Sequence, residues 1–184
     1  MNEQLNEQIL GTIRTTMAAV SMELDIIEQT TGVNMMYDFI DHCILVDIER
    51  LCEARLEMEE PLPLLEYVTA LTLHELGHAM DRKALLDSLP QTREIIDLKR
   101  RYSWRELSRS MPLMKKLIDE NERDYAFEQT AWHNASRMNR MCRLVDPKRL
   151  NEMQIHGLRT YEKSFEHDRV VYEGLAAAET AMAD

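Results

Sequence analysis

The chain has 184 residues, of which 45% are hydrophobic and 30% are charged, a composition typical of a globular protein with a substantial core. It carries 22 basic and 33 acidic residues, so the formal net charge is −11. This balance argues against nucleic acid or an anionic membrane as the main partner, because phosphate groups are bound by basic surfaces. The length favours a single domain over residues 1–184.

The amino-terminal residues and the cysteines do not suggest export. The first residues, Met1–Glu7, contain neither the basic nor the apolar region of a signal peptide, and no window approaches the length of a membrane span. The three cysteines, Cys43, Cys52 and Cys142, have no spacing typical of a disulfide framework or a metal site. We therefore expect reduced thiols and a cytoplasmic location.

The first third of the chain predicts one long helix followed by a small β element. Apolar residues recur every three or four positions over residues 3–30, which predicts an amphipathic helix ended by Thr30-Thr31-Gly32. Residues 33–48 are rich in β-branched and aromatic residues and predict a hairpin or two short strands. His42 lies within this segment and is expected in a turn. The helix period is carried by Leu5, Ile9, Ile13, Met17, Val20, Leu24 and Ile27.

The remaining sequence predicts helices separated by short breaks. Residues 49–59 favour a helix, and Pro61 and Pro63 then interrupt the chain, with Pro63 well placed to begin the next helix. Further helices are predicted over 91–101 after a turn at 87–90, over 112–141, and over 148–180 with interruptions at Gly157 and Gly174. Ser103 and Glu106 have the spacing of a capping box. The predicted fold is mainly α with a small β element.

The sequence His74-Glu75-Leu76-Gly77-His78 is the strongest functional signal in the chain. It lies in an apolar run without proline, so we expect a helix that places both histidines on one face, one turn apart. Two imidazoles at this spacing suit a zinc ion, and Glu75 can reach a water molecule near that ion without being a ligand. Gly77 leaves room beside the histidines for a strand or a substrate backbone.

This motif resembles the active-site helix of the zincin metallopeptidases. The metzincin group would require glycine at position 81 and histidine at position 84, where this chain has Asp81 and Ala84. The Gly-Thr-x-x-Tyr-x-Asp segment of the aspzincins is also missing from the sequence. The resemblance is therefore closest to the gluzincins, including their small minigluzincin-like and ImmA/IrrE-like members. It covers roughly residues 70–135.

A gluzincin takes its third zinc ligand from a second helix, and three glutamates are candidates for that role. Asn121-Glu122 is similar to the element that supplies this ligand in gluzincins, which makes Glu122 the first choice. The alternative is Glu120, with Asp124 bracing a zinc-bound histidine. Glu128 is the third candidate.

The resemblance implies a zinc-dependent peptidase that acts on a peptide or protein substrate. In such an enzyme Glu75 would deprotonate a zinc-bound water, which attacks the peptide carbonyl, and an edge strand would hold the extended substrate. Asp81 is a candidate for a supporting role near His78. Tyr161, His167 or Tyr172 could stabilise the oxyanion. The alternative function is a non-catalytic zinc-binding protein with a regulatory or interaction role, and oligomeric state is not predicted.

Overall fold

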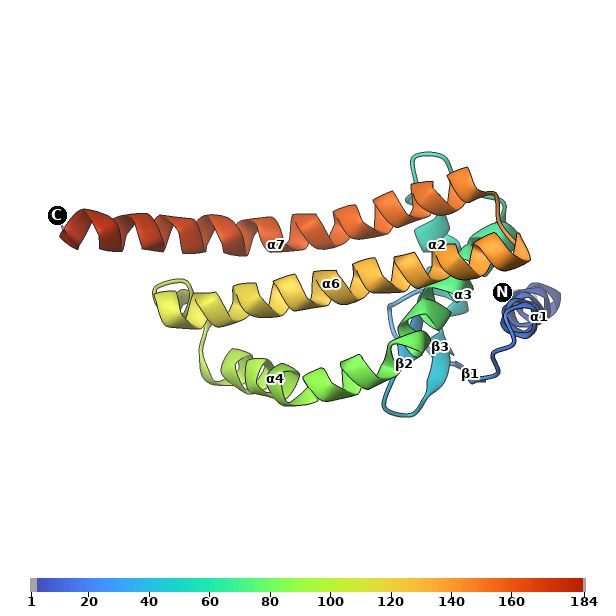
Figure 1. Cartoon of the computed structure of the whole chain (residues 1–184), viewed down its shortest axis with the longest axis horizontal. Coiled ribbons are helices and arrows are strands. Elements are labelled where there is room, and N and C mark those ends of the chain that lie inside the picture. Colours follow the sequence, from blue (N-terminus) through green and yellow to red (C-terminus); the bar gives the residue numbers. More distant parts are fainter. Residues whose placement is uncertain (1–2, 184) are drawn as a thin grey trace. The chain divides into compact units, whose positions relative to one another are not determined.

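A computed structural model describes residues 3–183 of the chain, and the side chains of these residues except 164 and 178–183. It is mostly helical with one small sheet, so the predicted α+β composition is confirmed (Figure 1). None of the described helices is both long enough and apolar enough to span a bilayer. The elements in chain order are α1 (Glu3–Ala19), β1 (Asp25–Glu28), β2 (Met35–Asp38), β3 (Cys43–Val46), α2 (Ile48–Leu56), α3 (Leu64–Met80), α4 (Arg82–Arg101), α5 (Trp104–Leu107), α6 (Met111–Cys142) and α7 (Pro147–Ala183).

The chain forms two compact units. The first comprises Met1–Lys83 and Gln129–His156, and the second comprises Ala84–Glu128 and Gly157–Asp184. Helix α6 passes from the second unit into the first between Glu128 and Gln129 without a break. The single domain expected from chain length stays a prediction.

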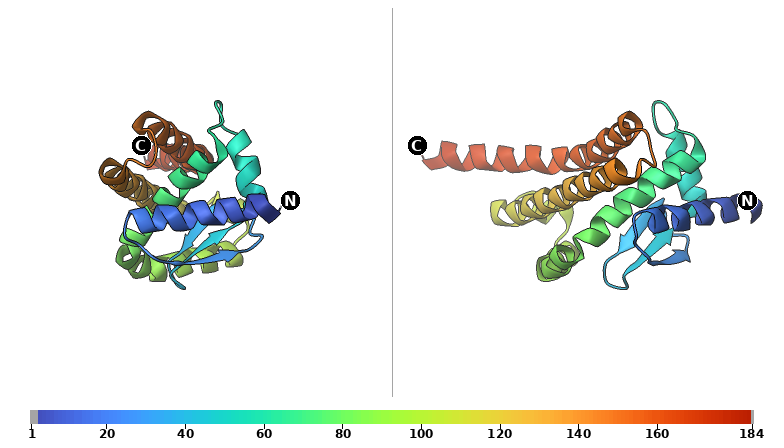
Figure 2. Two further views of the ribbon diagram at one scale, coloured as in Figure 1. Left: turned by 90° about the vertical axis from the view of Figure 1, so that its right-hand side faces the viewer. Right: turned by 45° about the vertical axis from the view of Figure 1, so that its right-hand side comes forward.

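The first unit is built around the sheet and helix α3. The strand order is β1-β3-β2, with β3 parallel to β1 and antiparallel to β2, so β2 is an edge strand. Side chains of Met35, Tyr37, Ile44 and Val46 make up the buried face of β2 and β3. Helix α3 packs against β2 and against α1, as two further views show (Figure 2).

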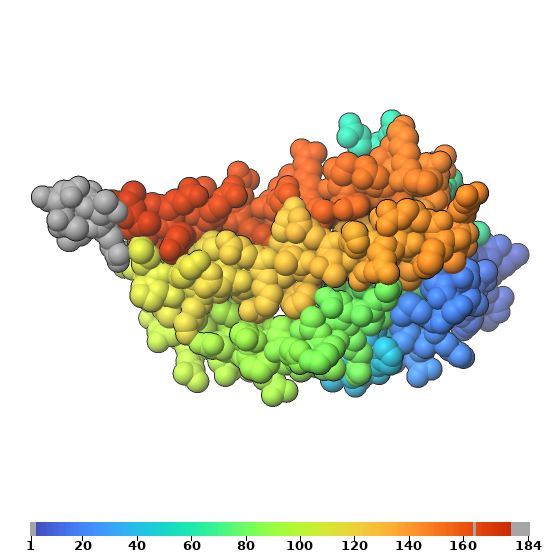
Figure 3. Space-filling model, viewed as in Figure 1, coloured from blue at the N-terminus to red at the C-terminus, as the bar shows by residue number. Residues whose placement is uncertain are grey.

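The second unit has a smaller core of its own, formed where α4, α5, α6 and α7 meet. Its buried side chains are those of Ile95, Leu98, Leu107, Met114 and Leu117, and Val171, Tyr172 and Leu175 of α7 cover them. The first half of α6 (yellow) and α7 (red) lie side by side along this unit (Figure 3).

Several predicted elements are confirmed. The 33–48 segment is a hairpin of β2 and β3 whose turn contains His42, and α2 occupies most of 49–59. Helix α6 covers the predicted 112–141 within one residue at each end. The capping box forms, since the backbone N–H of Ser103 donates to the Glu106 carboxylate at 2.8 Å.

The predicted helix over 3–30 was wrong beyond residue 19. Helix α1 ends at Ala19 because Ser21 adopts a left-handed conformation, with φ of 58°, which turns the chain away from the helix. The Ser21 and Met22 N–H groups then satisfy the last carbonyls of α1, those of Ala18 and Met17. Residues 25–28 form β1 instead, where Ile26 and Ile27 pair with β3.

The predicted breaks in the later helices were also wrong. Helix α4 runs through the expected turn with Pro90 inside it, and α7 continues through Gly157 and Gly174. A proline or glycine weakens a helix interior but does not end it when tertiary packing holds both sides. Beyond Pro90, Ile95 and Leu98 are buried in the core of the second unit.

Candidate metal centre

Helix α3 carries the His-Glu-x-x-His motif through the interior of the first unit. It begins after Pro63, whose carbonyl accepts the Tyr67 N–H at 2.9 Å, and it ends at Met80. Every residue from Tyr67 to Gly77 except Thr69 is buried. A helix buried on all sides needs apolar residues around its circumference, which explains the unbroken apolar run around the motif.

Gly77 allows helix α6 to approach α3 closely. A Cβ atom at Gly77 would lie 2.1 Å from the Ala131 carbonyl oxygen, which is far inside van der Waals contact. Asn134, which also lies on α6, donates a hydrogen bond from its side-chain amide to the Gly77 carbonyl at 3.1 Å. The space beside the histidines is therefore filled by the backbone of α6, rather than by a strand or substrate as the sequence suggested.

This close approach places one face of α6 against the motif. The indole of Trp132 stacks on the imidazole of His74, with ring centroids 4.2 Å apart and planes inclined by 25°. Glu128 precedes Ala131 by three residues and Trp132 by four, so the three share a helix face. The carboxylate of Glu128 is thereby directed to the same side of α6 as the contacts with α3.

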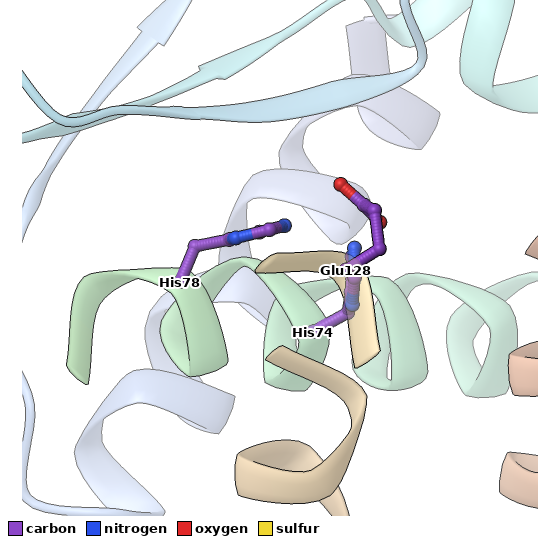
Figure 4. Close-up of side chains that lie close together, drawn as sticks. All are labelled: His74, His78 and Glu128. Atoms are coloured by element: carbon purple, nitrogen blue, oxygen red, sulfur yellow. The ribbon is translucent and has the colours of Figure 1, made fainter. Parts of the chain in front are cut away.

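His74, His78 and Glu128 bring three potential metal ligands together. One ligand atom from each lies within 4.8 Å of the other two (Figure 4). The imidazoles of His74 and His78 meet edge to face, with centroids 4.7 Å apart. Two imidazole nitrogens and one carboxylate oxygen form a donor set that zinc accepts in catalytic sites, so these residues fit the metal expected from the sequence.

Glu75 lies beside this group and contacts the edge strand. It is only 6% exposed, and its carboxylate accepts the Tyr37 N–H of β2 at 2.8 Å. Seven residues later, the Arg82 guanidinium donates to the carbonyls of Phe39 and Ile40 in the β2–β3 turn. The motif helix and the first residue of α4 thus hold the hairpin at two points.

Among the described residues, Glu122 and Glu120 lie outside the group of His74, His78 and Glu128 that could hold a metal ion. Glu122 is exposed and lines a cavity of about 560 Å³ between α6 and α7. Glu120 is 7% exposed and forms an ion pair with Arg123. The structure therefore joins the two histidines to Glu128, the third of the three candidates in the sequence.

The aromatic and imidazole candidates on α7 occupy different environments. The hydroxyl of Tyr161 donates to a carboxylate oxygen of Glu128 at 2.9 Å. His167 packs on Trp104 with ring centroids 5.4 Å apart, and Tyr172 packs against the core of the second unit. Of the three, only Tyr161 is hydrogen-bonded, among the described contacts, to a residue of the group that could hold a metal ion. Asp81 is the C-cap residue of α3.

Burial also raises the pKa of a group near Glu128. Desolvation raises the pKa of Asp124, one turn before Glu128, although Arg123 and Lys99 oppose the shift. The negative charge of Glu128 adds to the increase. A higher pKa favours the neutral form of Asp124 and reduces the repulsion between two carboxylates on one helix face.

A pattern in the sequence could have indicated Glu128. Ala131, Trp132 and Ala135 follow it at intervals of three, four and seven residues, and all three are buried. A glutamate at the end of such an apolar stripe is directed to the same buried surface. Apart from this stripe, nothing in the sequence predicted that Trp132 would stack on His74.

Comparison with protein-family models, curated proteins and solved structures finds no match to the chain. The resemblance to the gluzincins rests on the motif itself.

Proposed function

We propose that the protein is a zinc-dependent peptidase whose metal is held by His74, His78 and Glu128. The convergence of these three side chains within 4.8 Å is the observation that carries the proposal. A bound zinc ion would supply Lewis acidity, which polarises a peptide carbonyl and makes a water molecule more acidic. The presence of Glu75 next to the first histidine supports peptide hydrolysis over a purely structural metal.

Glu75 is the proposed general base. It would take the proton of the attacking water and pass it to the nitrogen of the departing amine, as one carboxylate can do in both steps. Its burial keeps the carboxylate within the helix–sheet interface, and the Tyr37 N–H fixes one of its oxygens.

The edge strand β2 is the proposed binding surface for an extended substrate. Peptides can add to an open sheet edge through main-chain hydrogen bonds. On this edge the Tyr37 N–H already donates to Glu75, and the Met35 N–H donates to the Asn34 side chain at 2.8 Å. A substrate backbone at this point would compete with Glu75 for the Tyr37 N–H.

Metal content tests the ligand set. We expect one zinc per chain in the wild type by inductively coupled plasma mass spectrometry, and loss of zinc in His78→Ala and Glu128→Ala. Glu122→Ala is the matched control on the same helix and should retain zinc. Loss of zinc in Glu122→Ala alone would restore the ligand first expected from the sequence, and a wild type without zinc after reconstitution would refute the site.

Activity tests the enzyme separately from the metal. Zinc-loaded wild type, incubated with peptides from a digested proteome, should generate new termini detectable by mass spectrometry. Glu75→Gln should bind zinc but lower cleavage by at least about a hundredfold, the lower end of the usual contribution of a general base. Equal cleavage by Glu75→Gln would exclude the proposed mechanism.

The second candidate is a non-catalytic zinc-binding protein with a regulatory or interaction role. The hydrogen bond from Tyr37 to Glu75 favours it, because this contact engages the proposed base in holding the hairpin. In that case zinc would stabilise the fold, while the wild type and Glu75→Gln would both leave the peptide mixture uncut.

A further inference from the structure

We propose that Tyr161 is a positioning residue that holds Glu128 in the orientation needed to bind the metal. This inference rests on the proposed zinc site. Its basis is the hydrogen bond of 2.9 Å from the Tyr161 hydroxyl to the Glu128 carboxylate. The bond joins α7 to α6 within the second unit, which contains both residues.

Glu128 needs such a partner more than the two histidines do. A glutamate side chain has several rotatable bonds, and fixing it in one rotamer costs conformational entropy. Carboxylates that bind metals are themselves commonly hydrogen-bonded, which orients them in advance. The Tyr161 hydroxyl engages the Oε1 atom of Glu128 and so restrains the orientation of the carboxylate.

The ring of Tyr161 is itself held in place. It is half-buried and meets the ring of Phe165, one turn later on α7, edge to face with centroids 6.0 Å apart. Edge-to-face aromatic pairs restrict the orientation of both rings. A rigid phenol at this point fixes the position of the hydroxyl and, through it, that of the carboxylate.

The same contact determines what Tyr161 does not do in this arrangement. A phenol has one O–H to donate, and here Glu128 accepts it. Tyr161 therefore cannot donate to a substrate oxyanion while it holds Glu128. Its role differs from the oxyanion stabilisation suggested by the sequence resemblance.

The chain offers a matched control one turn away. The Tyr125 hydroxyl donates to Glu162 at 2.7 Å, also between α6 and α7 in the second unit, but neither residue belongs to the metal-binding group. Tyr125→Phe and Tyr161→Phe each remove one hydroxyl and one tyrosine–glutamate hydrogen bond. Their effects on helix packing should be similar, whereas their effects on zinc binding should differ.

The test is the zinc dissociation constant of the full chain, measured by competition with a fluorescent zinc chelator. We expect Tyr161→Phe to weaken zinc binding by about 10- to 100-fold, the usual effect of removing a hydrogen bond to a ligand. Tyr125→Phe should bind zinc within about threefold of the wild type. Melting temperatures of the zinc-free proteins should fall by similar amounts in both variants, which separates positioning from loss of structure.

A double mutant measures how much of the effect of Tyr161 on zinc binding acts through Glu128. In a Glu128→Ala background, Tyr161→Phe should cause no further loss of zinc affinity, because its effect acts through the carboxylate. The inference would be overturned if Tyr161→Phe bound zinc as tightly as the wild type, or if it weakened zinc binding equally in the Glu128→Ala background. Either result would leave the proposed zinc site intact. Failure of the wild type to bind zinc would instead refute the proposed function, and the inference with it.

Discussion

Gly77 is the single residue on which the contact between α3 and α6 depends most directly. Gly77→Ala would bring a methyl group against the Ala131 carbonyl, at 2.1 Å before any adjustment. Since the neighbour is backbone, one helix must move, and such overpacking typically costs about 1–3 kcal/mol. We expect urea unfolding to show a loss of this size, together with weaker zinc binding.

Gly11 provides the control for this substitution. It lies in α1, and a Cβ atom there would have no neighbour within 4 Å. Gly11→Ala should therefore stabilise the protein by about 0.5–1 kcal/mol, the usual gain from replacing glycine in a helix. Destabilisation by both variants to the same extent would show that the α3–α6 contact is not the cause.

The choice among the three glutamates shows what residue spacing can decide. Glu122 and Glu128 are six positions apart, which on a helix corresponds to about 240° of rotation and about 9 Å of rise. The local sequence predicts that both are acidic residues on a helix and does not distinguish between them as ligands. The choice depends on which face of α6 meets α3, and that face is set by Gly77 and Ala131, whose contact spans 54 positions.

At the scale of single elements, the end of α1 yields a prediction about Ser21. This residue has φ of 58°, a left-handed conformation that costs a non-glycine residue about 1–2 kcal/mol. Ser21→Gly should relieve most of this strain, and the greater freedom of glycine in the unfolded chain should offset part of the gain. We expect urea unfolding to show a net stabilisation of about 0.5–1 kcal/mol.

Ser88 tests whether the stability change caused by a serine-to-glycine substitution depends on the backbone conformation of the site. It lies inside α4, where glycine is a poor helix former, so Ser88→Gly should destabilise the protein. If Ser21→Gly stabilises the protein and Ser88→Gly destabilises it, the gain at position 21 comes from its left-handed backbone conformation. A loss of stability in Ser21→Gly would mean that the serine contributes something beyond its backbone conformation.

Much of the element order follows from the sequence, and the exceptions have a common cause. The hairpin, α2, α3, the capping box at Ser103 and α6 follow from local periodicity and turn chemistry. The end of α1 and the continuity of α4 and α7 do not. In each exception a tertiary contact outweighs local preference: pairing of β1 with β3, burial of side chains beyond Pro90 in α4, or packing of Val171 and Leu175 on either side of Gly174 in α7.

The junction between α3 and β2 gives a prediction for hydrogen exchange. The Tyr37 N–H faces away from β3 and donates to the Glu75 carboxylate. A hydrogen bond to a charged acceptor is worth about 1.5–3 kcal/mol, so Glu75→Ala should speed exchange of this amide by about 10- to 100-fold. Nuclear magnetic resonance resolves this amide from that of Met36, which lies next to it on β2 and should change little. Equal acceleration at both would indicate general loosening of the strand.

At the scale of the whole molecule, the excess of acidic residues should make the free energy of unfolding depend on pH in the acidic range. With a net charge of −11 at neutral pH, many carboxylates must be protonated as the pH falls. Most are exposed, and their individual effects are small. Asp47 differs because it is buried and its carboxylate accepts three backbone N–H groups.

Asp47 accepts backbone N–H groups from Gly32, Arg50 and Thr31, and so joins the loop before β2 to the start of α2. These hydrogen bonds lower its pKa, with that from Gly32 the largest cause and that from Arg50 next. Because the folded pKa is below the unfolded value of about 3.9, ionised Asp47 stabilises the fold above that pH. The contribution is lost as the pH falls through the folded pKa.

Asp47→Asn should therefore lower the free energy of unfolding most at pH 5 and above, and less at progressively lower pH. The asparagine oxygen can still accept hydrogen bonds, but it lacks the charge that strengthens them. Urea midpoints of the wild type and the variant, measured from pH 7 to pH 2.5, should converge at the acidic end. Asp146→Asn is a useful comparison, because this exposed aspartate also accepts backbone N–H groups at a helix start, those of Lys148 and Arg149. A gap between wild type and Asp47→Asn that stays constant with pH would mean that the side chain acts through its shape rather than its charge.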